Sequence, residues 1–217
     1  MKPAVLIASL FTVLTASTAQ ADFIGANAEY GIFLPDTSFS KSGADYNYDD
    51  ETGSYFSIDV QHPIPLIPNV RFDSVSYDTK GKDDSGTSSI LEVSAQDITG
   101  YYGIGLLWVG IEGGLTVRSL DIDYTSGGTE FNASSSAIPL AYLGAHVAIP
   151  GTSIVLAAES KRLSLDSDIS VSDDIIKIGF QPLPIVGVEA GYRSITHEIK
   201  SVVLDSSGYF VGVTIEI

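Results

Sequence analysis

The chain has 217 residues, and its 27 acidic residues against 11 basic ones give a net charge of −16 at pH 7. This excess of negative charge argues against binding nucleic acid and against a basic patch for anionic lipid. The chain contains no cysteine, which excludes disulfides, thiol chemistry and a cysteine-linked lipid anchor. The length suits one barrel or one large sandwich, and no linker-like stretch divides it.

The first 21 residues predict export. Met1-Lys2-Pro3 is a basic start, residues 4–14 are almost wholly apolar, and Ala19-Gln20-Ala21 is a small-x-small cleavage site. The apolar run is shorter than the roughly 20 residues of a membrane-spanning helix, which favours a cleaved signal peptide over an uncleaved anchor. We therefore expect a signal peptide at 1–21 and one mature domain at 22–217, in which 10 basic and 27 acidic residues leave a net charge of −17.

Alternation of apolar with polar or small residues predicts strands throughout the mature chain, and no helical period persists. The clearest run is 208–217, where Tyr209, Val211 and Val213 share one face with the two later isoleucines. The parity is unclear after Asp73, and a β-bulge there would account for this. Ten segments are predicted, with eight as the reserve count, at 23–33, 54–61, 70–79, 90–103, 109–118, 137–149, 154–161, 176–180, 186–193 and 208–217.

The connections alternate in character. One set is short and mostly contains proline, which cannot donate to a strand ladder. The other set is longer, polar and mostly acidic, and is predicted to form loops at 35–53, 80–89, 124–136, 165–173 and 197–207. Outer-membrane barrels show this asymmetry, and their last strand must pair with the first because lipid leaves no partner for an open edge.

A soluble β-sandwich is the main structural alternative, because it would bury the same apolar face inside the protein. Aromatic residues near the predicted strand ends favour lipid as the partner of that face; they are Tyr30, Trp108, Phe180 and Tyr209. We therefore predict an all-β fold, a transmembrane antiparallel up-and-down β-barrel.

The opposite face of the predicted strands carries charge. Buried charges are tolerable only when they are paired and hydrogen-bonded, so this face predicts either a structural polar core or the lining of a narrow pore for small solutes or ions. The residues assigned to the lumen are Glu29, Asp59, Arg71, Asp97, Glu112, Arg118, Glu159, Lys161, Lys177, Glu189 and Arg193.

Catalysis and a specific metal site are weakly supported. The three histidines, His62, His146 and His197, have no nucleophile at a telling spacing, although His197 could meet loop residues such as Asp166 or Asp205, and Gly-x-Ser-x-Gly is absent. The run starting at Asp45 begins like a calcium loop but lacks its glycine and bidentate glutamate. We expect no catalytic residues, no bound metal and no cofactor.

The predicted loops carry many carboxylates, which could gather divalent cations and bridge to lipopolysaccharide phosphates; merely solvated loops are the alternative. The residues concerned are Asp45, Asp49, Asp50, Glu51, Asp83, Asp84, Asp121, Asp123, Asp173 and Asp174. Outer-membrane lipid and lipopolysaccharide are thus the expected partners.

The segment His62-Pro63-Ile64-Pro65-Leu66-Ile67-Pro68-Asn69, which follows the strand containing Asp59, resembles a family of small outer-membrane β-barrel proteins from Gram-negative bacteria. The segments 187–194 and 208–215 also look like this family, and the similarity runs the mature length. The resemblance implies a barrel in the cell outer membrane and no catalytic residues. The last strand resembles the signal read by the outer-membrane assembly machinery, which implies that machinery as a partner.

Together these features predict an integral outer-membrane barrel with a structural or surface role and a largely plugged polar lumen. The alternative function is a narrow porin-like channel. A barrel hydrolase and a soluble secreted sandwich are weaker candidates.

Overall fold

The computed structural model describes residues 25–41, 44–48, 52–64, 66–82, 86–165, 169–199 and 202–217. The expected signal peptide at 1–21 lies outside these residues. Within them, no helix is long and apolar enough to cross a membrane.

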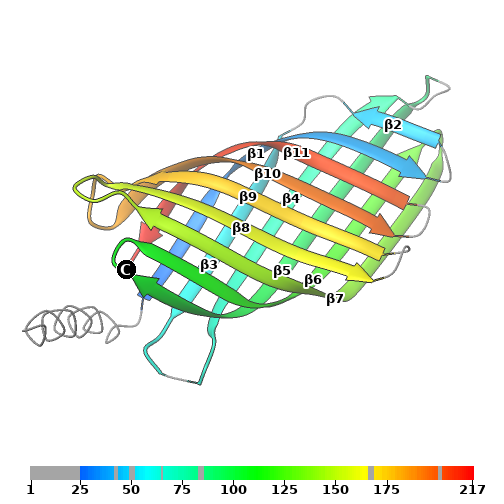
Figure 1. The fold of residues 1–217 in the computed structure, drawn as a ribbon. Helices are drawn as coiled ribbons and strands as arrows, with labels where there is room; N and C mark the ends of the chain where they lie inside the picture. Colours follow the sequence, from blue (N-terminus) through cyan, green and yellow to red (C-terminus); the bar gives the residue numbers. More distant parts are fainter. Residues whose placement is uncertain are drawn as a thin grey trace, which may run out of the picture.

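Ten long antiparallel strands form one closed barrel, which confirms the predicted fold and the count of ten rather than eight (Figure 1). Each strand pairs with its neighbours in chain order, and the short β2 adds a further pairing between β1 and β4 beyond the end of β3. The strands are β1 (Gly25–Lys41), β2 (Ala44–Tyr48), β3 (Gly53–Gln61), β4 (Asn69–Lys82), β5 (Ser88–Leu106), β6 (Val109–Ser126), β7 (Thr129–Ala148), β8 (Ile154–Leu165), β9 (Ile169–Phe180), β10 (Val186–Ile199) and β11 (Val202–Glu216).

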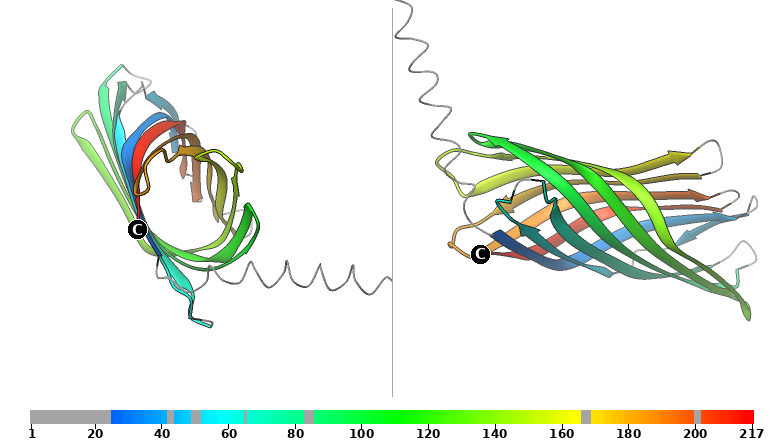
Figure 2. Two further views of the ribbon diagram at one scale, coloured as in Figure 1. Left: turned by 90° about the vertical axis from the view of Figure 1, so that its left-hand side faces the viewer. Right: turned by 90° about the horizontal axis from the view of Figure 1, so that it is seen from below.

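The barrel closes through β1 and β11, which pair along fifteen residues from Asn27–Glu216 to Lys41–Val202. Reciprocal backbone hydrogen bonds join Ala26 and Ile217 at 2.9 and 2.8 Å. Closure leaves neither of these strands with an unpaired edge along this ladder, as a barrel in lipid requires. Residue 25 and the C-terminus therefore lie at the same end, called here the terminal end; the opposite end is the distal end (Figures 1 and 2).

The predicted loops at the distal end are largely strand. The segment expected as a loop at 124–136 is a hairpin whose two strands meet at Gly127 and Gly128, both with positive φ. Similar extensions occupy much of the other four predicted loops. The sequence interpretation was wrong there because it followed one apolar face, and that face changes sides along the strand.

The change of face is clear on β5. Near the terminal end, Ile98 and Tyr102 face outward while Asp97 faces inward; farther along the same strand, Glu92 faces outward while Val93 faces inward. The same exchange explains the unclear parity after Asp73 on β4. A bulge is not the cause, because the pairings of β4 with β3 and β5 run through Asp73 without a shift.

The interior of the distal half is a hydrophobic core. It contains Phe33, Phe39, Leu91, Leu120 and Leu204, each 2% exposed or less. Because the 17 residues of β1, at about 3.3 Å each and tilted by about 40°, rise about 40 Å, the strands overshoot a lipid belt of about 25 Å. The distal half therefore projects into water, where an apolar interior and a polar exterior are the stable arrangement.

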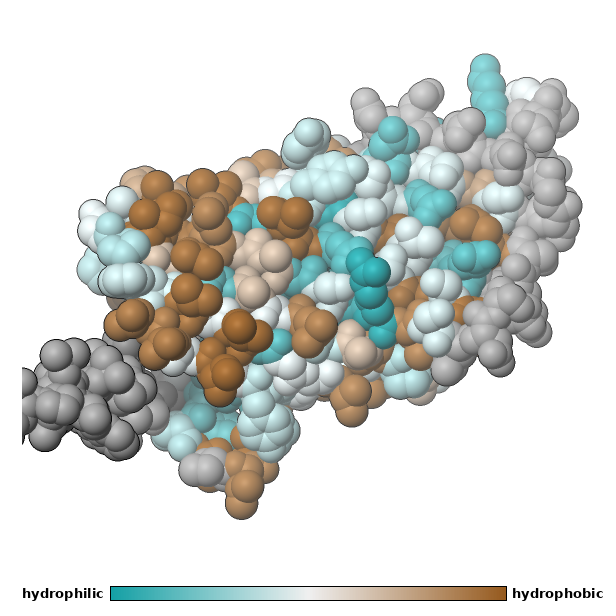
Figure 3. All heavy atoms as spheres, viewed as in Figure 1, coloured by the Kyte–Doolittle hydropathy of each residue, from teal (hydrophilic) through white to brown (hydrophobic). Residues whose placement is uncertain are grey.

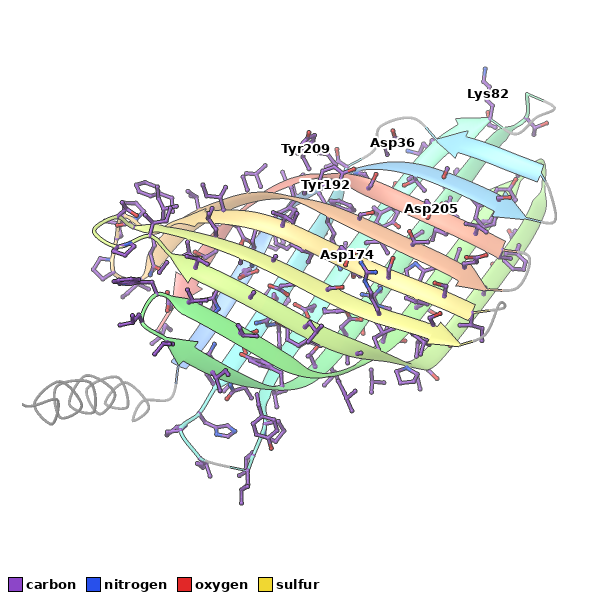
Figure 4. All side chains as sticks on the ribbon, in the orientation of Figure 1. Asp36, Lys82, Asp174, Tyr192, Asp205 and Tyr209 are labelled. Atoms are coloured by element: carbon purple, nitrogen blue, oxygen red, sulfur yellow. The ribbon has the colours of Figure 1, made fainter. Side chains whose placement is uncertain are left out.

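The exterior nearer the terminal end is apolar. Hydrophobic side chains gather there, whereas polar ones dominate the distal exterior (Figure 3). Tyr192 and Tyr209 stack edge to face on this exterior, with ring centroids 5.3 Å apart, and are 41% and 71% exposed. Beyond them Asp36 and Asp205 point outward (Figure 4). The two tyrosines thus mark one boundary of the lipid-facing belt.

Candidate functional site: the ionic network inside the barrel

All eleven side chains assigned to the lumen face the barrel interior, and each makes at least one ion pair with another interior side chain. They lie in the half of the barrel whose exterior is apolar and at its junction with the hydrophobic core. Alternation positions them, since every second residue of β1, β3–β6 and β8–β10 points inward there. The pairs involve Glu29, Asp59, Arg71, Asp97, Glu112, Arg118, Glu159, Lys161, Lys177, Glu189 and Arg193.

Arg71 on β4 is the centre of the first group. Its guanidinium lies 3.1 Å from Asp59, 3.4 Å from Glu112 and 2.9 Å from Glu159. The rings of Tyr101 and Tyr142 flank the guanidinium, with their centroids 5.2 and 5.5 Å from its carbon. Bidentate and stacked contacts of this kind suit the planar guanidinium, and an ammonium could not reproduce them.

The tyrosine hydroxyls complete the first group. Tyr101 donates a hydrogen bond to Asp59 at 2.6 Å, and Tyr142 donates one to Glu112 at 2.6 Å while accepting one from Arg71 at 2.9 Å. Each of these carboxylates therefore has a neutral donor as well as a cation. Such extra hydrogen bonds are what make burial of several charges tolerable.

Lys177 on β9 is the centre of a second group. Its ammonium lies 2.7 Å from Glu29 and 3.1 Å from Glu189. Tyr55 donates a hydrogen bond to Glu189 at 2.6 Å, and its ring lies over the facing glycines Gly31 and Gly212, where an added Cβ would meet it. The two glycines thus leave room for the ring against the wall.

Arg118 on β6 is the centre of a third group, nearer the distal end. Its side chain is fully buried and bonds Asp97 at 2.7 and 2.8 Å, and it also pairs with Asp173. Arg193 pairs with Asp173 at 2.7 Å, and Lys161 bridges Asp97 and Asp73 at 2.8 Å each. Three cations and three carboxylates thereby form one continuous cluster across the barrel.

The three groups together hold eight carboxylates and five cations among the described residues. Their formal charge is −3 with every group ionised. A cavity of about 50 Å³ lies against them, lined by Glu29, Arg71, Lys177 and Phe210 among others. That volume holds a few water molecules.

Several members of the network were missing from the predicted site. Asp173 was expected in an acidic loop, but it lies inside β9 and is 1% exposed. The prediction was wrong because Asp173 lies where the apolar residues of β9 pass from the outer face to the inner face. No single apolar face continues through this position, so the strand was not recognised. Asp73 and the hydroxyls of Tyr55 and Tyr101 could have been found, because they share the parity of Arg71, Asp59 and Asp97 on their own strands. Tyr142 lies on β7, which carries none of the predicted charges.

The three histidines lie on different elements of the fold and have different partners. His62 lies in the turn after β3, bonded to the carbonyl of Pro68 at 3.1 Å, and His146 lies on β7, 3.9 Å from Glu112. His197 points inward and approaches Arg118 at 3.3 Å. His197 does not meet Asp205, because Asp205 faces outward (Figure 4); Asp166 lies outside the described residues.

The acidic residues proposed for cations are divided among different places. Asp121, Asp123 and Asp174 face outward on the strands, with Asp174 2.8 Å from Arg162. In the part of the chain that the structure describes, no group of three or more histidine or carboxylate side chains is arranged to hold a metal ion. The other expected members, Asp49, Asp50, Glu51, Asp83 and Asp84, lie outside that part, as does the side chain of Asp45.

No protein-family model and no curated protein sequence matches the chain. Solved structures that resemble it include the attachment invasion locus protein Ail of Yersinia pestis in complex with sucrose octasulfate, at 10% identity and a TM-score of 0.46, over 89% of this chain and 99% of that one. The outer membrane protease OmpT from Escherichia coli has the same identity and TM-score, over 89% and 96%. The translocator domain of the autotransporter NalP from Neisseria meningitidis matches at 12% identity and a TM-score of 0.45, over 98% and 96%.

At these identities and TM-scores the likenesses assign no activity to this chain. The fold and the location follow from its own geometry. A closed barrel with an apolar outward belt and charges inside is the architecture of Gram-negative outer-membrane proteins. The chain is therefore an outer-membrane β-barrel, as the resemblance implied.

Proposed function

We propose that this protein is a passive integral barrel of the outer membrane, whose lumen is closed by the ionic network and whose distal half presents a rigid surface outside the bilayer. The observation that carries the proposal is the pairing of the charges in the ionic network, among the residues that the structure describes. Each of the five cations that the described residues contribute to the network lies within 3.1 Å of at least one carboxylate. Ions or solutes passing through would have to break these pairs.

The hydrophobic core of the distal half supports the same proposal. A hydrated ion that entered between the distal strands would meet Phe33, Leu91 and Leu204 before reaching the network. Apolar constrictions exclude ions because the ions cannot keep their water there. A polar lumen and an apolar core in series thus oppose conduction.

We expect no single-channel steps when the purified protein is inserted into planar lipid bilayers. The reason is that an ion crossing the barrel would have to pass both the hydrophobic core and the ionic network. The measurement is current at fixed voltage in potassium chloride, with insertion verified by protease protection. Steps in the unaltered protein, shifted by charge reversal at Arg118 or Arg193, would instead establish a narrow channel.

The role that we propose is not catalytic. None of the three histidines approaches both a hydroxyl nucleophile and an orienting carboxylate among the described residues. A hydrolase of this kind needs all three groups together. Absence of turnover with peptide and ester substrates is the corresponding expectation.

We also propose that outward carboxylates at the distal edge of the belt hold divalent cations that bridge to lipopolysaccharide phosphates. The best-placed residues are Asp121 and Asp123 on β6, which are two positions apart and therefore adjacent on the outer face of the strand. Oxygen ligands are those preferred by magnesium and calcium. Chelation should therefore weaken the association.

Replacing Asp121 and Asp123 by asparagine is expected to reduce the lipopolysaccharide that stays with the barrel through purification. The loss should match that produced by chelator in the unaltered protein, because both remove the same bridge. Retained lipopolysaccharide is measured by mass spectrometry of the extracted lipid. The flanking pair Ser119→Ala and Thr125→Ala serves as the control, and equal retention in all variants would mean that these carboxylates are only solvated.

A further inference from the structure

The wall of the barrel is interrupted between β7 and β8. These strands pair only from Ala141–Arg162 to Ala148–Val155. Beyond Ala141, β7 continues toward the distal end, paired with β6 alone, and the end of β8 is paired with β9 alone. The β6–β7 hairpin extends away from the neighbouring strands at the distal end (Figure 2).

Local sequence explains the interruption. Pro139 stands two residues beyond the last pair and has no backbone N–H to donate, so it cannot extend the ladder fully. The register between β6 and β7 also shifts between Arg118 and Leu120, which bends β7 at this height. Proline and bulges are found at edges of sheets, and β7 becomes an edge here.

A cavity of about 510 Å³ opens beside the interruption. Its walls come from β6, β7, β8, β9 and β11, and most lining side chains are aliphatic or aromatic, among them Ile122, Phe131, Ile138, Leu163 and Val171. The polar side chains among the described lining residues are the serines at 134 and 135, and none of these lining residues is charged. The cavity is thus separate in character from the ionic network.

The cavity reaches the outside through the wall. Its lining includes Ile138, which faces inward and is 8% exposed, and Pro139, which faces outward on the same strand. The outer face beside the gap passes from Ala158 to Ser160 and Arg162 along β8. The opening therefore lies at the distal edge of the lipid belt, within reach of both the outer lipid leaflet and the outside.

We propose that this cavity is a binding site for an uncharged hydrocarbon group, entered sideways between β7 and β8. The volume lies within the range of small-molecule sites, roughly 300–1,000 Å³. An apolar cavity is poorly hydrated and accepts apolar ligands, and the lining offers no charge to hold an ion. A free hydrocarbon and the acyl chain of a lipid share this chemistry, and the test below separates them.

The test places a fluorescent reporter in the wall. The chain has one tryptophan, so Trp108→Phe with Phe131→Trp gives a single reporter that lines the cavity. The protein is inserted into nanodiscs of phosphatidylcholine, and 1-bromooctane is added as a quencher. In a second preparation the phosphatidylcholine itself carries bromine on its acyl chains. Heat-shifted mobility in SDS gels verifies that each variant is folded.

Saturable quenching by 1-bromooctane is the expected result. Ala133→Phe, which fills the cavity, should weaken the apparent affinity by roughly tenfold or more, because each displaced methylene costs about fourfold. Val202→Phe fills the cavity from β11 and should weaken the apparent affinity to a similar extent. Two filling variants on different strands make a folding defect in one of them an insufficient explanation. Ala141→Phe adds the same ring on the lipid-facing side and should change little.

Quenching in the brominated bilayer without added bromooctane identifies a lipid acyl chain as the occupant. Quenching by bromooctane alone identifies a free hydrocarbon. The proposal is overturned if neither quencher acts saturably, or if both filling variants are quenched as strongly as the protein with the open cavity.

Discussion

Replacing Arg118 by methionine is expected to lower the free energy of unfolding by about 3–5 kcal/mol, because it removes the cation that two buried carboxylates share. The guanidinium is fully buried and contacts both Asp97 and Asp173. Asp97 keeps Lys161 and Asp173 keeps Arg193, but each of these buried carboxylates loses one of its two cations. Arg118→Lys keeps the charge but loses the planar guanidinium, so its free energy of unfolding should lie between those of the unaltered protein and Arg118→Met.

The matched control for this prediction is Arg162→Met. Arg162 pairs with Asp174 at 2.8 Å, but its side chain is 66% exposed on the outer surface. An exposed pair of this kind contributes about 0–1 kcal/mol. Urea unfolding in lipid vesicles, followed by the fluorescence of Trp108, compares the two. Equal losses for Arg118→Met and Arg162→Met would contradict a structural role for the interior network.

Replacing Val213 by arginine is expected to cost about 2–4 kcal/mol, the cost of a cationic side chain at the middle of a bilayer. Val213 lies on the outer face of β11 between Tyr30 and Val188 of the neighbouring strands, and is 48% exposed. In water such a substitution would be nearly neutral. The measurement is the same unfolding titration in vesicles.

The control for Val213→Arg is Ser207→Arg on the same face of the same strand, beyond the ring of Tyr209. Near the boundary the cost falls to about 0–1 kcal/mol. If Val213→Arg were as stable as Ser207→Arg, the outer face would be in contact with water or protein rather than lipid. That outcome would contradict a barrel embedded in a membrane.

The sequence predicted the lipid-facing half well, for a physical reason. There each strand has one apolar side in lipid and one charged side in the lumen, so parity alone assigns residues such as Glu29 and Ile32. Ten strands and the eleven interior charges could be placed in this way. The ion-pair partner of each charge could not be predicted, since pairs such as Lys177 with Glu29 join residues 148 apart in the chain.

The distal half could not be predicted by the same rule. Beyond the belt the solvent on the outside changes from lipid to water, so the apolar side of each strand turns inward. On the outer face of β6, for example, Val117 is followed by Ser119 and Asp121, a change to polar residues that is typical of a loop. The inward residues Leu120 and Ile122 on the opposite face indicate that the strand continues. The gap between β7 and β8 depends on tertiary register, which no local pattern encodes.

The ladder between β1 and β11 has a kinetic consequence. It joins Ala28 to Ile215, whereas the other long ladders connect strands that follow each other directly or, for β1 and β3, with only the short β2 between them. Hairpins such as β10–β11 need only short segments to meet, so they can form early, but the final seam requires the two most distant strands to find each other. Until then both seam edges are open to pairing with other chains. The rate of that last step sets how long an incompletely assembled molecule remains prone to aggregation.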